Sequence, residues 1–556
     1  MPRLARSFAY LALVGVTATC SASSSGKATK ESDKGSSFTL FATTELFGNI
    51  EPCGCTSDPM GDLSRTVALI AGARAGKDAV IYVDGGSTLY AKPPLPAEAA
   101  TQTSAKANLL LQTMTQRLHV DAVGLGATDL AMGPEGVRPP RQAANVPASA
   151  GLPLAEPTVV TAGGVEVGIF GATSPTLVPA AGPVIDAARA AVAKLRAGGA
   201  QVVVGLAYMP MREARDLARE VDGIDIIVVG ADAPEPDKII PDPGKVRSTW
   251  LVQPGNRGQV VTRMDVTVRG GGPLADALGA ARAKSHIAAL GERIPALQAQ
   301  LAKWAKDPTA DADFVATKKK ELADLEAQKA ALEKNPLQVP DKGSWFVMQQ
   351  VQISKGLPCD AGMQAAKTKL DEEVGKANVA AAKDDQPTPP EKGHPGYSGI
   401  EECGFCHGDA VKFWKKTRHA EAWKTLVDAG KQWSYDCIGC HVTGWKEPGG
   451  ATLSVNDDLR DVQCEVCHGP GSIHVDQDGK EKPLSLVTKP PAERCKKCHT
   501  PAHSDTFDYD AYLRDVTVPG HGEKLRKELG DGPTAHELRK AALEKAGAEV
   551  GPGCKK

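Results

Sequence analysis

Short apolar runs alternate with stretches of helical periodicity through the first half of the chain, from Phe38 to about residue 270. The clearest runs are Ala79–Val83, Val165–Phe170, Gln201–Leu206 and Ile224–Val229. Runs of this length, rich in β-branched residues and bounded by turn residues, are typical of buried strands. Buried strands that alternate with helices predict an α/β layered domain over residues 38–270.

The segment that follows carries the apolar stripe of two amphipathic helices. The stripe repeats at steps of three and four residues, at Ile287, Leu290, Ile294, Leu297, Leu301 and Trp304 and then at Leu322, Leu325 and Leu332. Asp307 and Pro308 separate the two halves, so residues 272–335 are predicted to form an antiparallel helical hairpin. Two roles stay open for it: packing between domains, or contact with a second copy of the chain in a homodimer.

Two further segments have weaker patterns. Residues 336–392 are predicted to be a connecting region, and its end, from residue 378 onwards, has the Pro-rich polar composition of a linker. Residues 522–556 are predicted to be a charged helical tail with a solvated surface.

The first 20 residues have the order of an export signal. Arg3 and Arg6 precede an apolar run from Phe8 to Val16, which is too short to span a bilayer, and small residues follow. Cys20 leaves two alternatives: cleavage nearby, or lipidation of this cysteine as a membrane anchor. Residues 21–37, rich in Ser, Gly and Lys, are predicted to be a flexible linker. The mature protein is therefore expected in the periplasm or another extracytoplasmic compartment.

The length and charge of the chain limit the number of domains and the classes of binding partner. At 556 residues the chain is long enough for two or three separate cores. Lys and Arg number 65 and Asp and Glu 67, which gives a net charge of -2. This balance provides no overall attraction to nucleic acid or to an acidic membrane surface.

Eight of the 13 cysteines form four copies of the pattern Cys-x-x-Cys-His. In chain order these attachment motifs are Cys403, Cys406 and His407; Cys437, Cys440 and His441; Cys464, Cys467 and His468; and Cys495, Cys498 and His499. Two thiols at this spacing reach the two vinyl groups of one porphyrin, and the adjacent imidazole ligates the iron as the proximal ligand. The sequence therefore predicts four covalent haem c groups in the C-terminal third.

Two other uses of paired cysteines fit these motifs less well than haem. Zinc ribbons also contain Cys-x-x-Cys, but they need no histidine directly after every second cysteine, and an exported chain is poorly suited to keeping thiols for zinc. A disulfide framework leaves the four histidines without a role.

The second axial ligand of each iron decides between electron transfer and the binding of a small ligand. Five histidines near the motifs are candidates: His394, His419, His474, His503 and His521. His419 lies in a predicted helix after the first motif, and His474 follows a Gly-rich turn that allows close approach to a porphyrin. These two are preferred as distal ligands. His394 and His503 fit surface imidazoles or propionate partners at least as well.

Residues 393–521 are predicted to form the haem domain, and within it the segment from about Tyr397 to His521 resembles the tetrahaem cytochrome c-554 family, known as electron acceptors of hydroxylamine oxidoreductase. The resemblance rests on the motif spacing, on Trp414–His419, on Cys464–His474 and on the closing Phe507–Leu513 with His521 beyond it. It implies three haems with two imidazole ligands each, with His419, His474 and His521 as the distal ligands in an unassigned order. It also implies an open iron at His441, and electron transfer as the function.

The N-terminal domain resembles the 5'-nucleotidase group of calcineurin-like metallophosphatases. The shared phrases include Phe41–Ile50, Gly61–Arg65, Val83–Ser87 and Val123–Leu130. The positions where that family has metal ligands hold Glu45, Leu46 and Phe47, Ser87, Ala127, Thr128 and Asp129, and Tyr208, Ala231 and Ala233. Because two divalent ions need several carboxylate and imidazole ligands, we expect neither a dinuclear metal site nor phosphatase activity. The alternative is a displaced site built from Asp58, Asp62, Asp84 and Asp129.

The remaining cysteines form an even set if Cys20 is lipidated or removed. Cys53 and Cys55 are separated by one residue, so a disulfide between them would be strained and labile. A structural role with Cys359 or Cys554 as partner is preferred, and two disulfides of unknown connectivity are expected.

Together these patterns predict a multidomain chain: an α/β metallophosphatase-like sandwich, a helical hairpin and a mostly α multihaem cytochrome c domain. The leading interpretation is an extracytoplasmic electron carrier with unidentified redox protein partners. One alternative is a reductase or oxidase that acts on a small nitrogen or sulfur oxyanion at an open haem. Another is a nucleotide hydrolase with a cytochrome appendage.

Overall fold

The computed structural model describes residues 35–52, 55–76, 78–480, 482, 484–547 and 549–554. The predicted export signal with Cys20, most of the predicted linker 21–37, and Cys53 lie outside the described residues.

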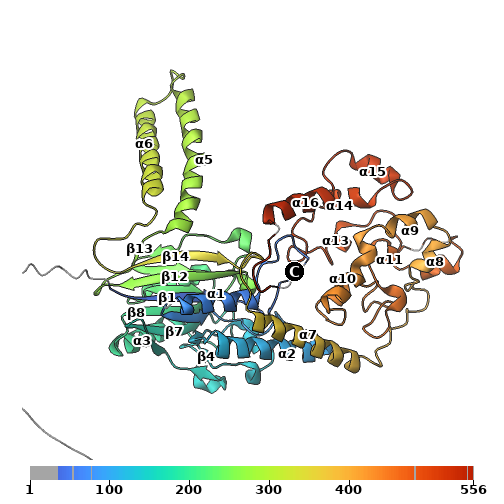
Figure 1. The fold of residues 1–556 in the computed structure, drawn as a ribbon, viewed down its shortest axis with the longest axis horizontal. Helices are drawn as coiled ribbons and strands as arrows, with labels where there is room; N and C mark the ends of the chain where they lie inside the picture. Colours follow the sequence, from blue (N-terminus) through green and yellow to red (C-terminus); the bar gives the residue numbers. More distant parts are fainter. Residues whose placement is uncertain are drawn as a thin grey trace, which may run out of the picture.

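Two six-stranded sheets form the centre of the N-terminal region (Figure 1). In the first sheet the order is β13-β14-β12-β1-β2-β3, with β1 (Ser36–Thr43), β2 (Val80–Asp84), β3 (Ala122–Val123), β12 (Val260–Val268), β13 (Ala275–Asp276) and β14 (Trp345–Gln352). In the second it is β10-β11-β9-β8-β7-β6, with β6 (Thr158–Ala162), β7 (Val165–Thr173), β8 (Val202–Tyr208), β9 (Ile226–Val229), β10 (Gly244–Val246) and β11 (Thr249–Val252). A short pair, β4 (Arg141–Gln142) and β5 (Leu154–Ala155), lies beside them.

Both faces of each central strand are buried, which explains the nearly continuous apolar runs. In β1, Leu40 and Ala42 pack in the core between the two sheets, while Phe41 packs in the core beneath the helices. The helices on the first sheet are α1 (Leu63–Ala75), α2 (Ala100–Gln112) and α7 (Ala361–Ala381), and those on the second are α3 (Val184–Ala197) and α4 (Met211–Glu220). The result is a four-layer α/β/β/α sandwich, and the predicted fold class of this region is confirmed.

The predicted amphipathic stripes belong to α5 (Ala280–Trp304) and α6 (Ala312–Lys334), which run antiparallel and project from the body of the molecule (Figure 1). Leu290, Leu297, Leu325 and Leu332 are buried between the two helices. Arg282 fixes the base of the hairpin by ion pairs with Asp242 and Asp276. Dimerisation through the hairpin stays a prediction.

Residues 336–392 are more than a connecting region. Strand β14 pairs with β12 along its whole length, from Trp345 with Thr267 to Gln352 with Val260, and α7 packs against α1 and α2. The predicted linker therefore begins too early, since Asn378 lies inside α7 and is buried. Both elements pair with segments far away in sequence, so their local patterns did not reveal them.

A disulfide joins Cys359, which precedes α7, to Cys554 at the end of the chain. The preferred pairing of Cys53 or Cys55 with Cys359 or Cys554 is therefore wrong, because Cys359 and Cys554 pair with each other. The disulfide ties the C-terminal tail to the N-terminal domain across a loop of 195 residues.

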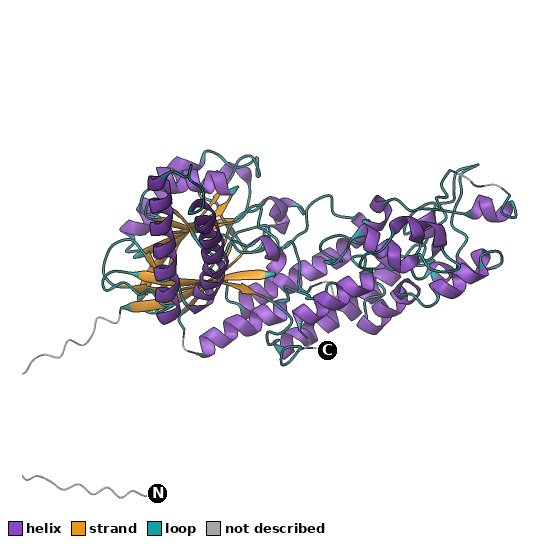
Figure 2. Ribbon diagram, turned by 90° about the horizontal axis from the view of Figure 1, so that it is seen from above, coloured by secondary structure: helices purple, strands orange, loops and turns teal. Residues whose placement is uncertain are grey.

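The C-terminal region is built from short helices and long loops, whereas the strands lie at the opposite end of the molecule (Figure 2). Its helices are α8 (Ile400–Gly404), α9 (Gly408–Trp414), α10 (Ala422–Ala429), α11 (Cys464–His468), α12 (Ser472–Asp476), α13 (Ala492–Cys495), α14 (Tyr509–Val516), α15 (Glu523–Leu529) and α16 (Ala535–Ala546). The predicted single tail helix is thus divided into α15 and α16, because Gly530–Pro533 interrupts it. Among the described residues, no helix has the length and apolar character needed to cross a membrane.

Candidate functional site

The four attachment motifs all lie on short helical turns of the C-terminal region. The third motif occupies α11, and the fourth begins at the last residue of α13. The second lies on a 3-10 turn, Ile438–Cys440, and the first spans the end of α8 and the residue before α9. A helical turn of this kind brings the first cysteine and the histidine, four residues later, onto one side.

Six of the predicted ligands form three pairs of facing imidazoles. The ring centroids are 6.5 Å apart for His407 and His474, 6.2 Å for His419 and His499, and 5.9 Å for His468 and His521. A metal–imidazole bond is about 2 Å long, so one iron between two imidazoles places their ring centres roughly 6 Å apart. The spacing of each pair therefore fits one iron with two histidine ligands.

Backbone and hydroxyl groups fix the orientation of several of these rings. The Nδ1–H groups of His468 and His521 donate to the carbonyl oxygens of Val487 at 2.7 Å and Val516 at 2.6 Å. Nδ1 of His499 lies 3.1 Å from the Ser504 hydroxyl. Partners of this kind hold the ring and leave Nε2 for a metal.

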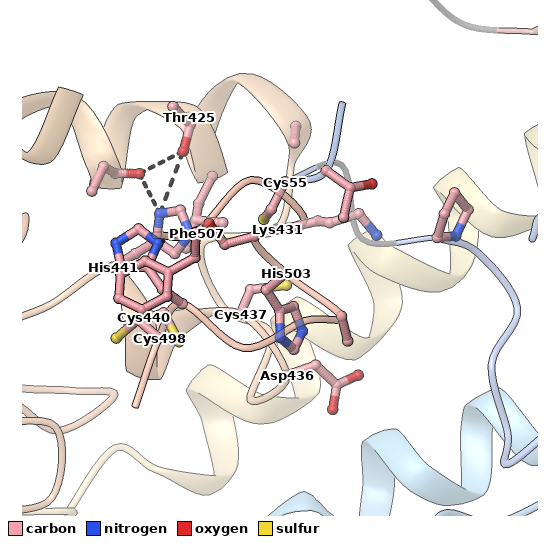
Figure 3. A pocket seen from close by; sticks show the side chains of 18 of the residues that line it. Cys55, Thr425, Lys431, Asp436, Cys437, Cys440, His441, Cys498, His503 and Phe507 are labelled. Carbon is pink, nitrogen blue, oxygen red and sulfur yellow. Dashed lines mark hydrogen bonds between the residues drawn. The ribbon is translucent and has the colours of Figure 1, made fainter. Parts of the chain in front are cut away.

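His441 differs from the other three proximal candidates. None of the ring contacts among the described residues joins it to a second imidazole. Its Nδ1–H donates to the carbonyl oxygen of Ala422 at 2.6 Å, and the hydroxyl of Thr425 lies 3.4 Å away (Figure 3). The two reserve histidines, His394 and His503, have exposed side chains.

Burial lowers the pKa of His419, of His468 and, to about 4, of His499. The cause is the loss of hydration that a charged imidazole would suffer inside the protein. These rings are therefore neutral at pH 7, which is the state that binds a metal.

Contacts between thiols show which motifs are neighbours. The Cys403 thiol donates a hydrogen bond to Cys464, which together with burial raises the pKa of Cys403 and places the first motif against the third. Cys440 of the second motif hydrogen bonds to Cys498 of the fourth. Burial and the nearby Cys495 raise the pKa of Cys467 to about 11, so the third motif also lies close to the fourth. The four motifs thus follow one another in space in the order first, third, fourth, second.

A cavity of 2410 Å³ separates the N-terminal domain from the attachment motifs (Figure 3). Its walls include Cys440, His441 and His499 on one side and Glu45 and Arg257 on the other. Pockets for small molecules are usually about 300–1,000 Å³. The space is therefore large enough for more than one large cofactor.

The N-terminal wall of this cavity is the edge at which the resemblance places metal ligands. The Glu45 carboxylate accepts from the backbone N–H of Ala233 at 2.8 Å and from the Tyr208 hydroxyl at 3.2 Å, while Ser87 donates to Tyr208 at 2.8 Å. Burial raises the pKa of Glu45. Both oxygens of the Glu45 carboxylate therefore accept hydrogen bonds from protein groups. Glu45 is the carboxylate that matches a metal-ligand position and faces this edge.

The four leftover acids have structural partners. Asp62 caps α1 and forms a buried ion pair with Lys367, and Asp84 accepts from the hydroxyls of Thr43 and Thr88. Asp129 accepts from three backbone N–H groups and from Arg141, and Asp58 accepts from the Lys355 backbone at 3.4 Å. Within the described part of the chain, no three His, Cys, Asp or Glu side chains form a group that could hold a metal ion.

Replacing Asp129 by asparagine is expected to destabilise the N-terminal domain by about 3–5 kcal/mol, because it leaves the charge of Arg141 buried and unpaired. Both side chains of this pair are fully buried, at 2.8 Å. The measurement is the free energy of unfolding from urea titration. Asp186→Asn is the matched control, since its pair with Arg189 is exposed and is expected to contribute less than about 1 kcal/mol. Equal unfolding energies for the two variants would contradict the structural role of Asp129.

Sequence reasoning missed the residues that join the two regions. Gln102 of α2 and Asn378 of α7 contact the loop before Cys437, and Lys431 after α10 pairs with an acidic residue of α7. A polar residue at a helical position carries no local signal of such a contact, because its partner lies more than 50 residues away in the chain.

Comparison with known proteins gives results for both regions. Residues 402–469 match the family model described as cytochrome c554 and c-prime. Cytochrome c-554 of Nitrosomonas europaea is 31% identical over 134 residues, which cover 18% of this chain and 57% of that protein. The chain thus spans little more than half the length of this relative.

Solved structures similar to this one match mainly over the N-terminal region. A 5'-nucleotidase precursor from Thermus thermophilus is 26% identical, with a TM-score of 0.36, and covers 43% of this chain and 53% of its own. The sulfate thiohydrolase SoxB of Thermus thermophilus is 17% identical, with a TM-score of 0.40, and covers 67% of each chain. The chain therefore combines a C-terminal region similar to the cytochrome c554 family with an N-terminal domain similar to metallophosphatases of the 5'-nucleotidase group.

Proposed function

We propose that the C-terminal region binds four covalent haem c groups and transfers electrons outside the cytoplasm. Haem c supplies one-electron chemistry at its iron. The observation that carries the proposal is the set of three imidazole pairs at 5.9–6.5 Å beside four Cys-x-x-Cys-His motifs. Two imidazole ligands saturate an iron and favour electron transfer over ligand binding.

The proposed ligand sets follow from the pairs. His407 and His474 serve the first motif, His468 and His521 the third, and His499 and His419 the fourth. His441 serves the second motif as a single axial ligand. The order of motifs in space then gives one path for electrons, with the first and second motifs at its two ends.

The location outside the cytoplasm has two supports. The N-terminal segment has the pattern of an export signal. The Cys359–Cys554 disulfide is a feature of chains that mature in oxidising compartments. The redox partners are proposed to be other proteins, because Cys406 of the first motif, at one end of the path, is exposed.

Intact mass and pyridine haemochrome absorbance of protein made in a cytochrome-maturing host test this proposal. Four haems per chain, bound through thioether bonds, are expected. An unmodified mass would contradict it.

For the N-terminal domain we propose a role without metal-dependent hydrolysis. The support is that Glu45, Asp62, Asp84 and Asp129 are held by hydrogen bonds and ion pairs within the fold. Full-length protein is therefore expected to release no phosphate from nucleotides in the presence of Mn²⁺. Manganese-dependent release that is lost in Glu45→Gln would contradict this expectation.

A second candidate function is the reduction or oxidation of a small nitrogen or sulfur oxyanion at the second motif. The specific observation in its favour is that no described imidazole faces His441 across a possible iron position, and that this residue lines the interdomain cavity. Turnover of such an oxyanion that disappears in His441→Ala would establish it. Unchanged rates in that variant would remove it.

A further inference from the structure

The N-terminal domain holds the segment that carries the second attachment motif at two places. The first lies just after the end of α10, where the ammonium group of Lys431 is close to two carboxylates of the N-terminal domain. One belongs to Glu51, in the loop after β1, and the other to Asp371 of α7, at 2.9 Å. Burial alone would lower the pKa of Lys431, but the two carboxylates outweigh it and raise that pKa above its usual value. A charged lysine thus joins the two regions.

The second place is the loop just before Cys437. Asn378 of α7 donates from Nδ2 to the carbonyl oxygen of Trp433 at 2.9 Å, and Gln102 of α2 accepts from the backbone N–H of Tyr435 at 3.1 Å. Asn378 also donates to Gln102 at 3.1 Å, and these two side chains are 1% and 3% exposed. Polar groups buried this deeply are costly to leave unpaired, so they fix the loop firmly.

A third contact adds to this loop. Lys106 of α2 forms an ion pair of 2.7 Å with Asp436, the residue directly before Cys437. The loop is therefore bound from both α2 and α7.

The segment that the N-terminal domain contacts, with α10 at its start, also orients His441. The first residue of α10, Ala422, accepts the Nδ1–H of His441 at 2.6 Å. Nδ1 of His468 and of His499 bonds to Val487 and Ser504, which lie on other segments of the C-terminal region. A displacement of α10 would therefore move the acceptor that orients His441.

We propose that the N-terminal domain is a structural part of the second haem site, where it positions His441 through α10 and so sets the affinity of that iron for a small ligand. This inference rests on the proposed function, because it requires haem on Cys437 and Cys440. Lys431 and Asn378 are positioning residues in it. Outer partners of a metal-binding histidine set its orientation and basicity, and their loss typically changes affinity about 10- to 100-fold.

Lys431→Met in the full-length holoprotein tests the proposal, with carbon monoxide as the probe ligand. We expect the carbon monoxide affinity of the ferrous protein to change about tenfold and the iron–histidine band in the resonance Raman spectrum to shift. Lys424→Met is the matched control, because Lys424 lies on α10 itself, close in sequence to Lys431, and pairs with Asp428 in solvent. Lys431→Arg keeps the charge and is expected to restore wild-type values.

Asn378→Leu provides an independent variant on the side of the N-terminal domain. It is expected to alter the same band while the three low-spin haem spectra and the haem content stay as in the wild type. If both variants keep four haems and wild-type carbon monoxide affinity, the inference is overturned and the proposed function stands. If the wild-type protein carries no haem, the proposed function fails, and the inference fails with it.

Discussion

His474→Ala is expected to convert the haem of the first motif from low-spin to high-spin, which raises the high-spin share from one haem in four to two in four. The reason is that His474 is the imidazole that faces His407 at 6.5 Å, and its removal leaves that iron with one axial histidine. Electron paramagnetic resonance of the oxidised protein and carbon monoxide difference spectra of the reduced protein measure this share.

His394→Ala is the control for this experiment, since His394 is an exposed histidine of the same region. Its spectra are expected to match the wild type. A His474→Ala protein whose high-spin share is unchanged would contradict the pairing of His474 with His407.

Chain produced without cytochrome maturation is expected to fold in its N-terminal domain and to remain unfolded from about residue 383 to residue 521. Among the described residues, this region has one small cluster of buried apolar side chains, which includes Trp423, Ile438 and Leu453. The cavity beside the attachment motifs is open to solvent, so without haem its apolar walls stay wet. The haem-free C-terminal region therefore lacks the burial it needs.

Limited proteolysis followed by intact mass measures this difference. The haem-free chain is expected to be cut rapidly after α7, whereas the N-terminal domain through about residue 381 survives. Holoprotein treated in parallel serves as the control. Equal resistance of the two forms between residues 383 and 521 would show that the region has a sufficient core without haem.

The sequence predicted much of the fold because its signals are local. The runs at Ala79–Val83 and Gln201–Leu206 became β2 and β8, since a strand buried on both faces needs apolar residues at successive positions. Strand β14 was missed because it lies between the helical hairpin and α7, and its place in the sheet depends on pairing with β12, 78 to 92 residues earlier in the chain.

The candidate site likewise has a part that local sequence patterns predict and a part that depends on long-range contacts. The attachment motifs are contiguous, so the sequence alone placed them. The order of distal ligands was not accessible in this way, because His407 and His474 are 67 positions apart and meet only through tertiary structure. The link from Glu51 and Asp371 to Lys431 is likewise a long-range contact without a local pattern.

Quantitative Mössbauer spectroscopy of iron-57-enriched full-length protein, made in a cytochrome-maturing host, tests haem attachment and axial ligation together. Four haem irons per chain are expected, three low-spin with two histidine ligands and one high-spin at His441. A chain without covalently bound iron, or one whose four irons are all high-spin, would contradict this expectation.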